Sequence, residues 1–301
     1  NTPTIMKVFK IEKILIPIDF SETAYIAIEH AAYIAEKFKA ELVLLHVVER
    51  HWEQFNIIQP EMMVPNPSEM TQVIEKKLEQ VASDIFKKYG VKSTAITSDG
   101  SIFSEVISVA DEHNVDLIIM GTHGTKGFVQ FFIGSNTYKV VTQSFCPVLS
   151  VQKHAEKVGF QNIVLPIDDS LHSRQKVNHA ITIAKAFGST IHIVGLHESG
   201  GDKKFELKIE QIEEYVQKSG LKSTRKIFKD SNQAKISQEY AKAINADLII
   251  IMTDQDENIT GRLLGSFAQQ IVNHSPIPVI SVPPELGIID YPSLAGGYHG
   301  A

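Results

Sequence analysis

The strongest constraint on the fold of this chain is an internal repeat. The segment "IEKILIPIDFSETAYIAIEHAAYIAEKF" from Ile11 matches "FQNIVLPIDDSLHSRQKVNHAITIAKAF" from Phe160, at an offset of 149 residues. Further along, "DLIIM" from Asp116 matches "DLIII" from Asp247 at an offset of 131, so the second copy lacks 18 residues. Self-similarity over this length indicates that one structural unit is used twice in the 301 residues.

Each copy alternates apolar runs with stretches of helical periodicity. The apolar runs are continuous, which is typical of parallel strands that are buried on both faces of a sheet. In the first copy we expect strands at 13–18, 41–48, 91–98, 116–120 and 147–151, and helices at 22–39, 69–89, 101–113 and from Gly134 onward. This order predicts an α/β protein with two tandem, doubly wound domains, each built on a five-stranded parallel sheet.

A glycine-rich stretch follows the fourth expected strand of the first copy. It reads Gly121, two residues, Gly124, nine residues, Gly134-Ser135 and then Thr137. The spacing is neither that of a Walker loop nor that of the dinucleotide fingerprint. A glycine turn followed by a helix N-terminus offers backbone amides to a polyphosphate. The alternative is a surface loop shaped by turns, with Ser135 acting only as a helix cap.

Both copies resemble the universal stress protein family, and the chain resembles its tandem two-domain members. The stretches that carry the resemblance are "ILIPIDFSETAYIAIEHA", "LVLLHVVE", "DLIIMGTHG" and "FIGSNTYKVVTQSFCPVLSV". The resemblance implies an adenine nucleotide alpha-hydrolase-like, Rossmann-like fold. It places one domain with an intact nucleotide motif at 6–152 and one with a degenerate motif at 160–284, followed by a tail at 285–301.

The same resemblance implies an ATP site in the first copy. Adenine and ribose are expected near Asp19 and the backbone around Val47, and the phosphates along the glycine stretch. The expected nucleotide-binding residues are Pro17, Ile18, Asp19, Val47, Met120, Gly121, His123, Gly124, Gly134, Ser135, Asn136 and Thr137. The ligand would be ATP, ADP or AMP, with or without Mg²⁺, and no catalytic residue and no metal-ligand set is predicted in the protein itself.

Several of these residues also have a purely structural interpretation. Asp19 could cap the helix that starts near Ser21, although a carboxylate at the end of a strand is also a common acceptor for ribose hydroxyls. His123 could be an exposed loop histidine. We interpret His46 as a structural histidine of an apolar strand and Cys146 as a packing residue.

The second copy has lost most of the glycine stretch. At the offset of 131, Gly121 becomes Met252, Gly124 becomes Gln255, Asn136 becomes Phe267 and Thr137 becomes Ala268, while Gly265-Ser266 remains. Asp254 replaces His123 and adds negative charge. We therefore expect the first copy to bind the nucleotide and the second not to bind it in the same manner.

Composition narrows the list of partners. The net charge is −6 without a long basic block, which disfavours nucleic acid as a partner. No run approaches the roughly 20 apolar residues of a membrane span, and the single cysteine suits a cytoplasmic protein. The last strands, "PVLSV" and "IPVISV", would be exposed apolar edges, and the resemblance implies that the two domains pair through them; a homodimer is also consistent with it.

Three functions remain open. The resemblance implies a stress-response regulator that binds an adenine nucleotide. No Asp or Glu stands beside the glycine stretch to position water, which favours binding over hydrolysis. The first alternative is a slow ATPase that uses the same pocket. The second is a nucleotide-free scaffold that binds a protein partner through the insert at 50–70.

Overall fold

The chain forms two compact units, seen in a computed structural model that describes residues 9–49, 67–122, 133–197, 203–229, 232–253 and 264–284. The first unit is Ile11–Val158, and the second unit joins Asn1–Lys10 to Gly159–Ala301. Among the described residues, no helix combines the length and the hydrophobicity that crossing a bilayer requires.

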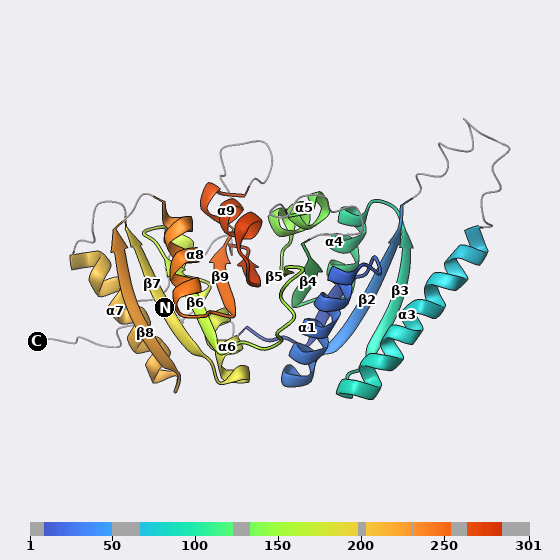
Figure 1. Cartoon of the computed structure of the whole chain (residues 1–301), viewed down its shortest axis with the longest axis horizontal. Helices are drawn as coiled ribbons and strands as arrows, with labels where there is room; N and C mark the ends of the chain where they lie inside the picture. The colour runs from blue at the N-terminus through green and yellow to red at the C-terminus, as the bar shows by residue number, and fades with distance from the viewer. Residues whose placement is uncertain are drawn as a thin grey trace, which may run out of the picture. The chain divides into compact units, whose positions relative to one another are not determined.

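The first unit is a five-stranded parallel sheet with the order β3-β2-β1-β4-β5 (Figure 1). The strands are β1 (Lys13–Pro17), β2 (Glu41–Val48), β3 (Ser93–Asp99), β4 (Leu117–Gly121) and β5 (Val148–Val151). The helices are α1 (Glu22–Phe38), α3 (Pro67–Tyr89), α4 (Ile102–Glu112) and α5 (Ser135–Gln143). The strand order reverses between β1 and β4, so the predicted doubly wound sheet is confirmed.

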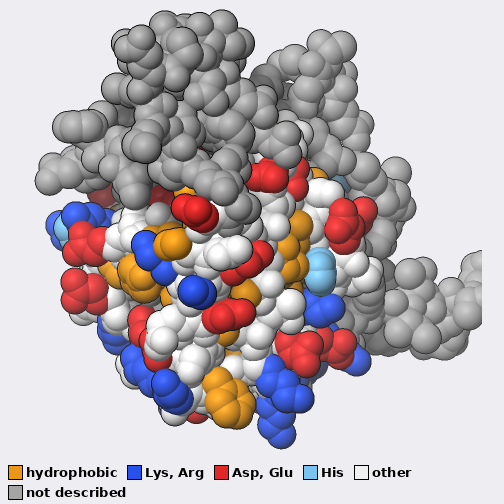
Figure 2. Space-filling model, turned by 90° about the vertical axis from the view of Figure 1, so that its right-hand side faces the viewer, with side chains coloured by type: hydrophobic (Ala, Val, Ile, Leu, Met, Phe, Trp, Pro, Cys, Tyr) orange, Lys and Arg blue, Asp and Glu red, His pale blue; other side chains and the backbone are white. Residues whose placement is uncertain are grey.

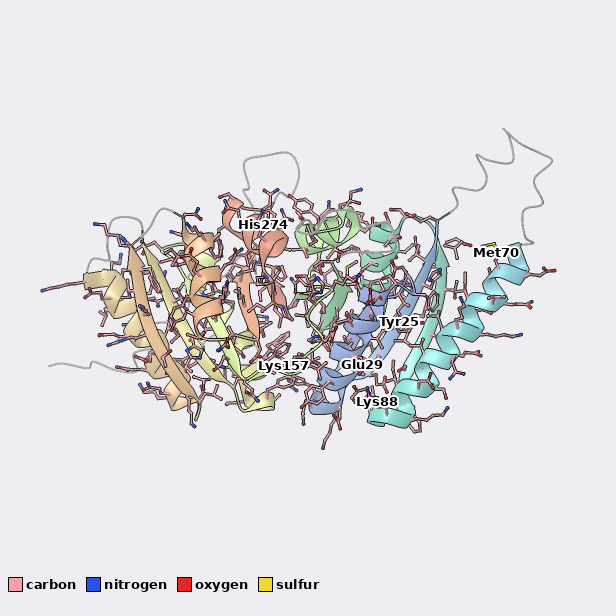
Figure 3. The ribbon with its side chains drawn as sticks, viewed as in Figure 1. Tyr25, Glu29, Met70, Lys88, Lys157 and His274 are labelled. Carbon is pink, nitrogen blue, oxygen red and sulfur yellow. The ribbon has the colours of Figure 1, made fainter. Side chains whose placement is uncertain are left out.

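The helices of the first unit cover both faces of this sheet. Helix α1 packs beside α3, and α4 packs beside α5. Figure 3 shows Glu29 of α1 and Lys88 of α3 between these two helices, where the Lys88 Nζ lies 2.6 Å from the Glu29 carboxylate. On the outer side of α3, acidic and basic side chains are interspersed (Figure 2).

The second unit repeats the sheet order as β8-β7-β6-β9-β10, again with parallel pairs. Its strands are β6 (Asn162–Ile167), β7 (Thr190–His197), β8 (Lys222–Lys229), β9 (Leu248–Met252) and β10 (Val279–Val282). Its helices are the 3-10 turn η1 (Leu171–Arg174) and α6 (Val177–Phe187), α7 (Lys203–Lys218), α8 (Gln233–Ala243) and α9 (Ser266–His274).

The two units differ where the first helix begins. Helix α1 starts at Glu22, directly after Ser21, whose Oγ accepts the Ala24 amide at 3.1 Å as a helix cap. In the second unit the matching segment forms η1, and the α-helix begins only at Val177. The second unit therefore replaces the first turns of the helix by a looser turn, at the edge of the sheet where strands β6 and β9 end.

Two histidines at matching positions hold the segments that precede the first strand of each unit. His30 of α1 donates from Nε2 to the carbonyl of Ala155 at 2.6 Å, within the first unit. His179 of α6 packs its ring 4.2 Å from that of Phe9, within the second unit. The carbonyl of Phe9 also accepts the Thr182 hydroxyl at 3.2 Å, so the beginning of the described chain is part of the second unit.

Candidate functional site

The carboxyl ends of β1 and β4 place the predicted residues at one edge of the first sheet. Pro17 is the last residue of β1, and Ile18 is buried, with its amide donating to the Leu45 carbonyl at 2.7 Å. Asp19 follows and is exposed, and its Oδ1 accepts the Ser21 amide at 3.0 Å. This bond shapes the turn into α1 and orients the carboxylate at the edge of the sheet.

The end of β4 is held closely against α1. A Cβ atom on Gly121 would lie 2.8 Å from Cγ2 of Thr23, a distance shorter than Cβ atoms keep from non-bonded atoms in real proteins. Gly121 is therefore required by the approach of α1, whatever else binds there. Met120, one residue earlier, is buried in the sheet, and its backbone pairs with Ser150 of β5.

The glycine stretch leaves β4 and returns to it. The amide of Gly134 donates to the carbonyl of Thr122 at 2.6 Å, and the hydroxyl of Thr137 donates to the carbonyl of Gly121 at 3.0 Å. A Cβ atom on Gly134 would lie 3.1 Å from the Thr122 carbonyl oxygen. Two bonds thus fix the start of α5 directly above the end of β4. Thr137 is buried, and its hydroxyl is used in fastening this helix.

The start of α5 can bind an anion through its backbone. Gly134 is the helix cap and offers no side chain, and the first intrahelical bond runs from the Tyr138 amide to the Gly134 carbonyl. The amides of the first turn have no partner inside a helix and carry its positive end. Ser135 is exposed and Asn136 is half-buried, so both lie at the surface of this turn.

The remaining predicted residues are placed less closely. Val47 lies near the end of β2, where it is half-buried. His123 and Gly124 lie outside the described residues, as do Asp254 and Gln255 of the second unit. Within the described ranges, no group of three His, Cys, Asp or Glu side chains comes close enough to hold a metal ion.

Two residues that we interpreted as structural have structural surroundings. His46 Nδ1 lies 2.7 Å from the Ile18 carbonyl, and its ring is 5.1 Å from that of Phe20. Cys146 is buried, and burial raises the pKa of its thiol to about 11, so the reactive thiolate is scarce at neutral pH.

The corresponding edge of the second unit is filled by side chains. A cavity of about 10 Å³ remains there, roughly the space of one water molecule. Its lining is Pro166, Asp168, Ser170, Lys176, Leu196, Met252 and Phe267. At the repeat offsets these residues match Pro17, Asp19, Ser21, Ala27, Val47, Gly121 and Asn136 of the first unit, and five of those seven are predicted site residues.

Lys176 is the residue of this pocket that the sequence analysis missed. It is 3% exposed, and its Nζ donates to Ser173 Oγ at 3.3 Å. Burial alone would raise the pKa of Asp168, but the charge of Lys176 and the hydroxyls of Ser170 and Ser173 outweigh it, and the pKa lies below its usual value. The sequence contained a signal for this burial, because Lys176 aligns with Ala27, a residue on the apolar side of the first helix.

Other contacts hold Asp168 in place. Its Oδ1 accepts the Ser170 hydroxyl at 2.6 Å and the Ser170 amide at 2.9 Å. Its backbone carbonyl accepts Lys208 Nζ at 2.5 Å. The carboxylate that is exposed at position 19 is therefore, at position 168, half-buried and bound within the protein.

Comparisons with known proteins agree with this fold. The family model of the universal stress protein family matches twice, at residues 10–152 and 159–283. A universal stress protein of Methanocaldococcus jannaschii is 31% identical over 155 residues, which cover 47% of this chain and 95% of that protein. Another from Bacillus subtilis is 30% identical over 145 residues, covering 46% of this chain and 98% of the relative.

A solved structure matches along nearly the whole chain. The crystal structure of a universal stress protein from Archaeoglobus fulgidus aligns with a TM-score of 0.73 at 22% identity, and covers 90% of this chain and 98% of that one. At this identity the likeness supports the fold alone. Together with the two matches of the family model, it leads to one conclusion: the chain belongs to the universal stress protein family and carries two of its domains in tandem.

Proposed function

We propose that the first unit binds an adenine nucleotide at the carboxyl edge of its sheet and that the second unit does not bind it in the same manner. The observation that carries this proposal is the contrast between the two edges. In the first unit, backbone amides of α5 are fixed above β4 beside the exposed Asp19. In the second unit, the matching edge is lined by the side chains of Lys176, Met252 and Phe267 around a cavity of about 10 Å³.

The described residues fit such a ligand. The first-turn amides of α5, with Ser135 and Asn136, would hold phosphate oxygens. Asp19 would accept ribose hydroxyls, and the backbone at Val47 would face the base. Pro17, Ile18, Met120, Gly121 and Gly134 would shape the walls, and Thr137 would act through its bond to Gly121. His123 and Gly124 keep their proposed place beside the phosphates on the family resemblance alone.

A bound Mg²⁺ would neutralise phosphate charge and would arrive with the nucleotide rather than on a protein cluster. We propose ATP as the ligand, with ADP and AMP as relatives that use the same base and ribose contacts. The assigned domains are 6–152, which carries the site, and 160–284, with the tail at 285–301 outside both.

We propose regulation by binding, in the cytoplasmic stress response, rather than turnover. Hydrolysis needs a group that positions water and charges that stabilise the transferring phosphoryl group. Among the described residues where β1 and β4 end, Asp19 is the acidic side chain, and its Oδ1 accepts the Ser21 amide. A slow ATPase would use the same pocket. In that case the protein would release phosphate from ATP, and variants that abolish ATP binding would also abolish this release.

The test is a matched pair of variants. Gly134→Val places a side chain against the Thr122 carbonyl at the start of α5, and we expect ATP affinity, measured by calorimetry with Mg²⁺, to fall by at least about 100-fold. Gly265→Val makes the same change at the start of α9 in the second unit and should leave affinity within about twofold. Equal losses in both variants, or ATP binding by neither the wild type nor the variants, would contradict the proposal. The latter result would favour the scaffold with the 50–70 insert.

The two domains also have a proposed mode of association. We propose that they pair through the strands that end each unit, β5 and β10, because short apolar strands such as Val148–Val151 and Val279–Val282 are poor free edges. A homodimer is a further possibility within the same proposal. Light scattering of the purified chain measures its mass, and charged substitutions in β10 should loosen the pairing.

A further inference from the structure

The two units also differ between the second and third strands of their sheets, away from the proposed phosphate site at β4 and α5. In the first unit, Val47 of β2 pairs in register with Ser98 of β3. In the second unit, the matching Leu196 of β7 pairs with Phe228 of β8. A serine in one unit thus corresponds to a phenylalanine in the other, directly beside a residue that lines the closed pocket.

Strand geometry shows on which face of the sheet this pair lies. Side chains of in-register residues in a parallel pair point to the same face. The ring of Phe228 lies 5.6 Å from that of Tyr240 in α8, which packs beside α9. Phe228 and Leu196 are therefore on the face that α8 and α9 cover. By the repeat, Ser98 and Val47 lie on the face of α4 and α5, where the start of α5 meets the end of β4.

The hydroxyl of Ser98 needs a hydrogen-bond partner. Its Oγ is shielded from solvent, and no hydrogen bond to it occurs among the described residues. The hydroxyls of Ser93 and Thr97 in the same strand are likewise shielded and without a hydrogen-bond partner in the described part of the chain, but the alternation of β3 directs these side chains to the opposite face of the sheet. A shielded hydroxyl without a partner is uncommon and destabilising, and a bound ligand is one explanation for it.

We propose that the base of the nucleotide sits across Val47 and Ser98 and that Ser98 Oγ hydrogen-bonds to its edge. The inference rests on the proposed function and adds a positioning residue on β3. A hydroxyl can donate to a ring nitrogen or accept from an exocyclic amino group, and a small side chain leaves room for a planar ring. In the second unit, the register position of Ser98 holds Phe228, whose ring packs against Tyr240.

The experiment compares four variants in ATP titrations by calorimetry. Ser98→Ala removes the hydroxyl and should weaken binding about tenfold, the size of one net hydrogen bond. Ser98→Thr keeps the hydroxyl and should bind within about threefold of the wild type. Ser98→Phe copies the second unit and should weaken binding by at least about 100-fold. Phe228→Ser, the reciprocal change, should not alter the affinity of the first unit.

The outcomes separate this inference from the proposed function. If the wild type does not bind ATP, the proposed function fails and the inference fails with it. If the wild type binds ATP, and Ser98→Ala and Ser98→Phe both bind it with the affinity of the wild type, the inference is overturned while the proposed function stands. Melting temperatures check that each variant folds. Should Ser98→Phe melt early, the difference between Ser98→Ala and Ser98→Thr decides, because a merely structural hydroxyl would change stability and leave affinity unchanged.

Discussion

The first and second units share a sheet order and differ in what occupies its carboxyl edge. In the first unit that edge is built from backbone: Gly121 lies against Thr23, and the Gly134 amide closes the loop onto Thr122. In the second unit it is built from side chains, with the buried Lys176 beside Asp168 and Met252. The comparison teaches that one fold can build this edge either from closely packed backbone or from buried charges and apolar side chains.

The residue at the end of the fourth strand also explains where the first helix of each unit begins. Thr23 of α1 can lie against β4 only because residue 121 has no side chain. In the second unit, residue 252 is a buried methionine, and the segment that matches the start of α1 is the turn η1, which contacts β9. We infer that the side chain of Met252 occupies the space that the start of α1 takes in the first unit, so that the matching segment of the second unit forms η1 instead.

The largest expected effect comes from breaking the charge pair of the second unit. Lys176→Ala removes the buried cation that most lowers the pKa of Asp168 and leaves Lys208 as a cation beside it, and we expect the second unit to lose about 3 kcal/mol of unfolding free energy in urea titrations. Lys176→Met keeps most of the side-chain volume and therefore isolates the loss of charge. The double variant Lys176→Met with Asp168→Asn should recover most of the lost unfolding free energy.

The matched control in the first unit is Asp19→Asn. Asp19 is exposed, and its bond to the Ser21 amide can be made by an asparagine oxygen, so unfolding free energy should change by no more than about 0.5 kcal/mol. A loss of unfolding free energy in Asp19→Asn as large as that in Lys176→Ala would remove the contrast on which the account depends.

The next effect tests residue size at the end of the fourth strand of each unit. Met252→Ala deletes a side chain that is 4% exposed and should destabilise the second unit by about 2–4 kcal/mol through the cavity it leaves. Gly121→Ala adds one methyl group against Thr23 and should destabilise the first unit by about 1–3 kcal/mol.

A second substitution examines the cause. Thr23→Ser removes the Cγ2 atom that lies 2.8 Å from the added Cβ, so Gly121→Ala should cost less in its presence. Thermal and urea unfolding measure both changes. If Gly121→Ala is neutral for stability and still weakens ATP binding, the glycine serves the ligand and not the packing of α1.

The smallest effect concerns a feature that the units share. Burial lowers the pKa of His179 to about 4, and it lowers the pKa of His30 as well, although the bond to the Ala155 carbonyl opposes the shift. Both histidines are neutral in the folded chain. Their contribution is complete above the unfolded pKa of about 6.5 and is lost as pH falls toward the folded pKa.

For His179 this loss amounts to at most about 3 kcal/mol between pH 6.5 and 4. Replacing it by glutamine removes the titrating group, so the unfolding free energy of His179→Gln should fall less steeply with pH than that of the wild type. Parallel curves for the two proteins would show that the histidine does not couple the Phe9 segment to pH.

The fold was predictable because its signal is repeated. The constant offsets align strands and helices of two copies, and continuous apolar runs such as "DLIIM" and "DLIII" are typical of buried parallel strands. The start of α5 was predictable as well, since Gly134 and Ser135 mark a helix N-terminus. These features depend on neighbours in sequence.

Features that depend on distant contacts were not predictable. No local pattern shows that Gly121 approaches Thr23, 98 positions away, or that Phe9 packs on His179 of the second unit. The burial of Lys176 could have been suspected from its alignment with Ala27, yet its effect on Asp168 requires the folded geometry. The pairing of Ser98 with Val47 likewise depends on the register between strands.

The most direct test of the central claim is the number of nucleotides that one chain binds. Native mass spectrometry of the nucleotide-stripped protein, titrated with ATP and Mg²⁺, counts bound ligands for each chain. The account predicts one ATP per chain in the wild type and none in Gly134→Val. Two ATP molecules per wild-type chain, or one that persists in Gly134→Val, would contradict the assignment of a ligand site to the first unit and a closed one to the second.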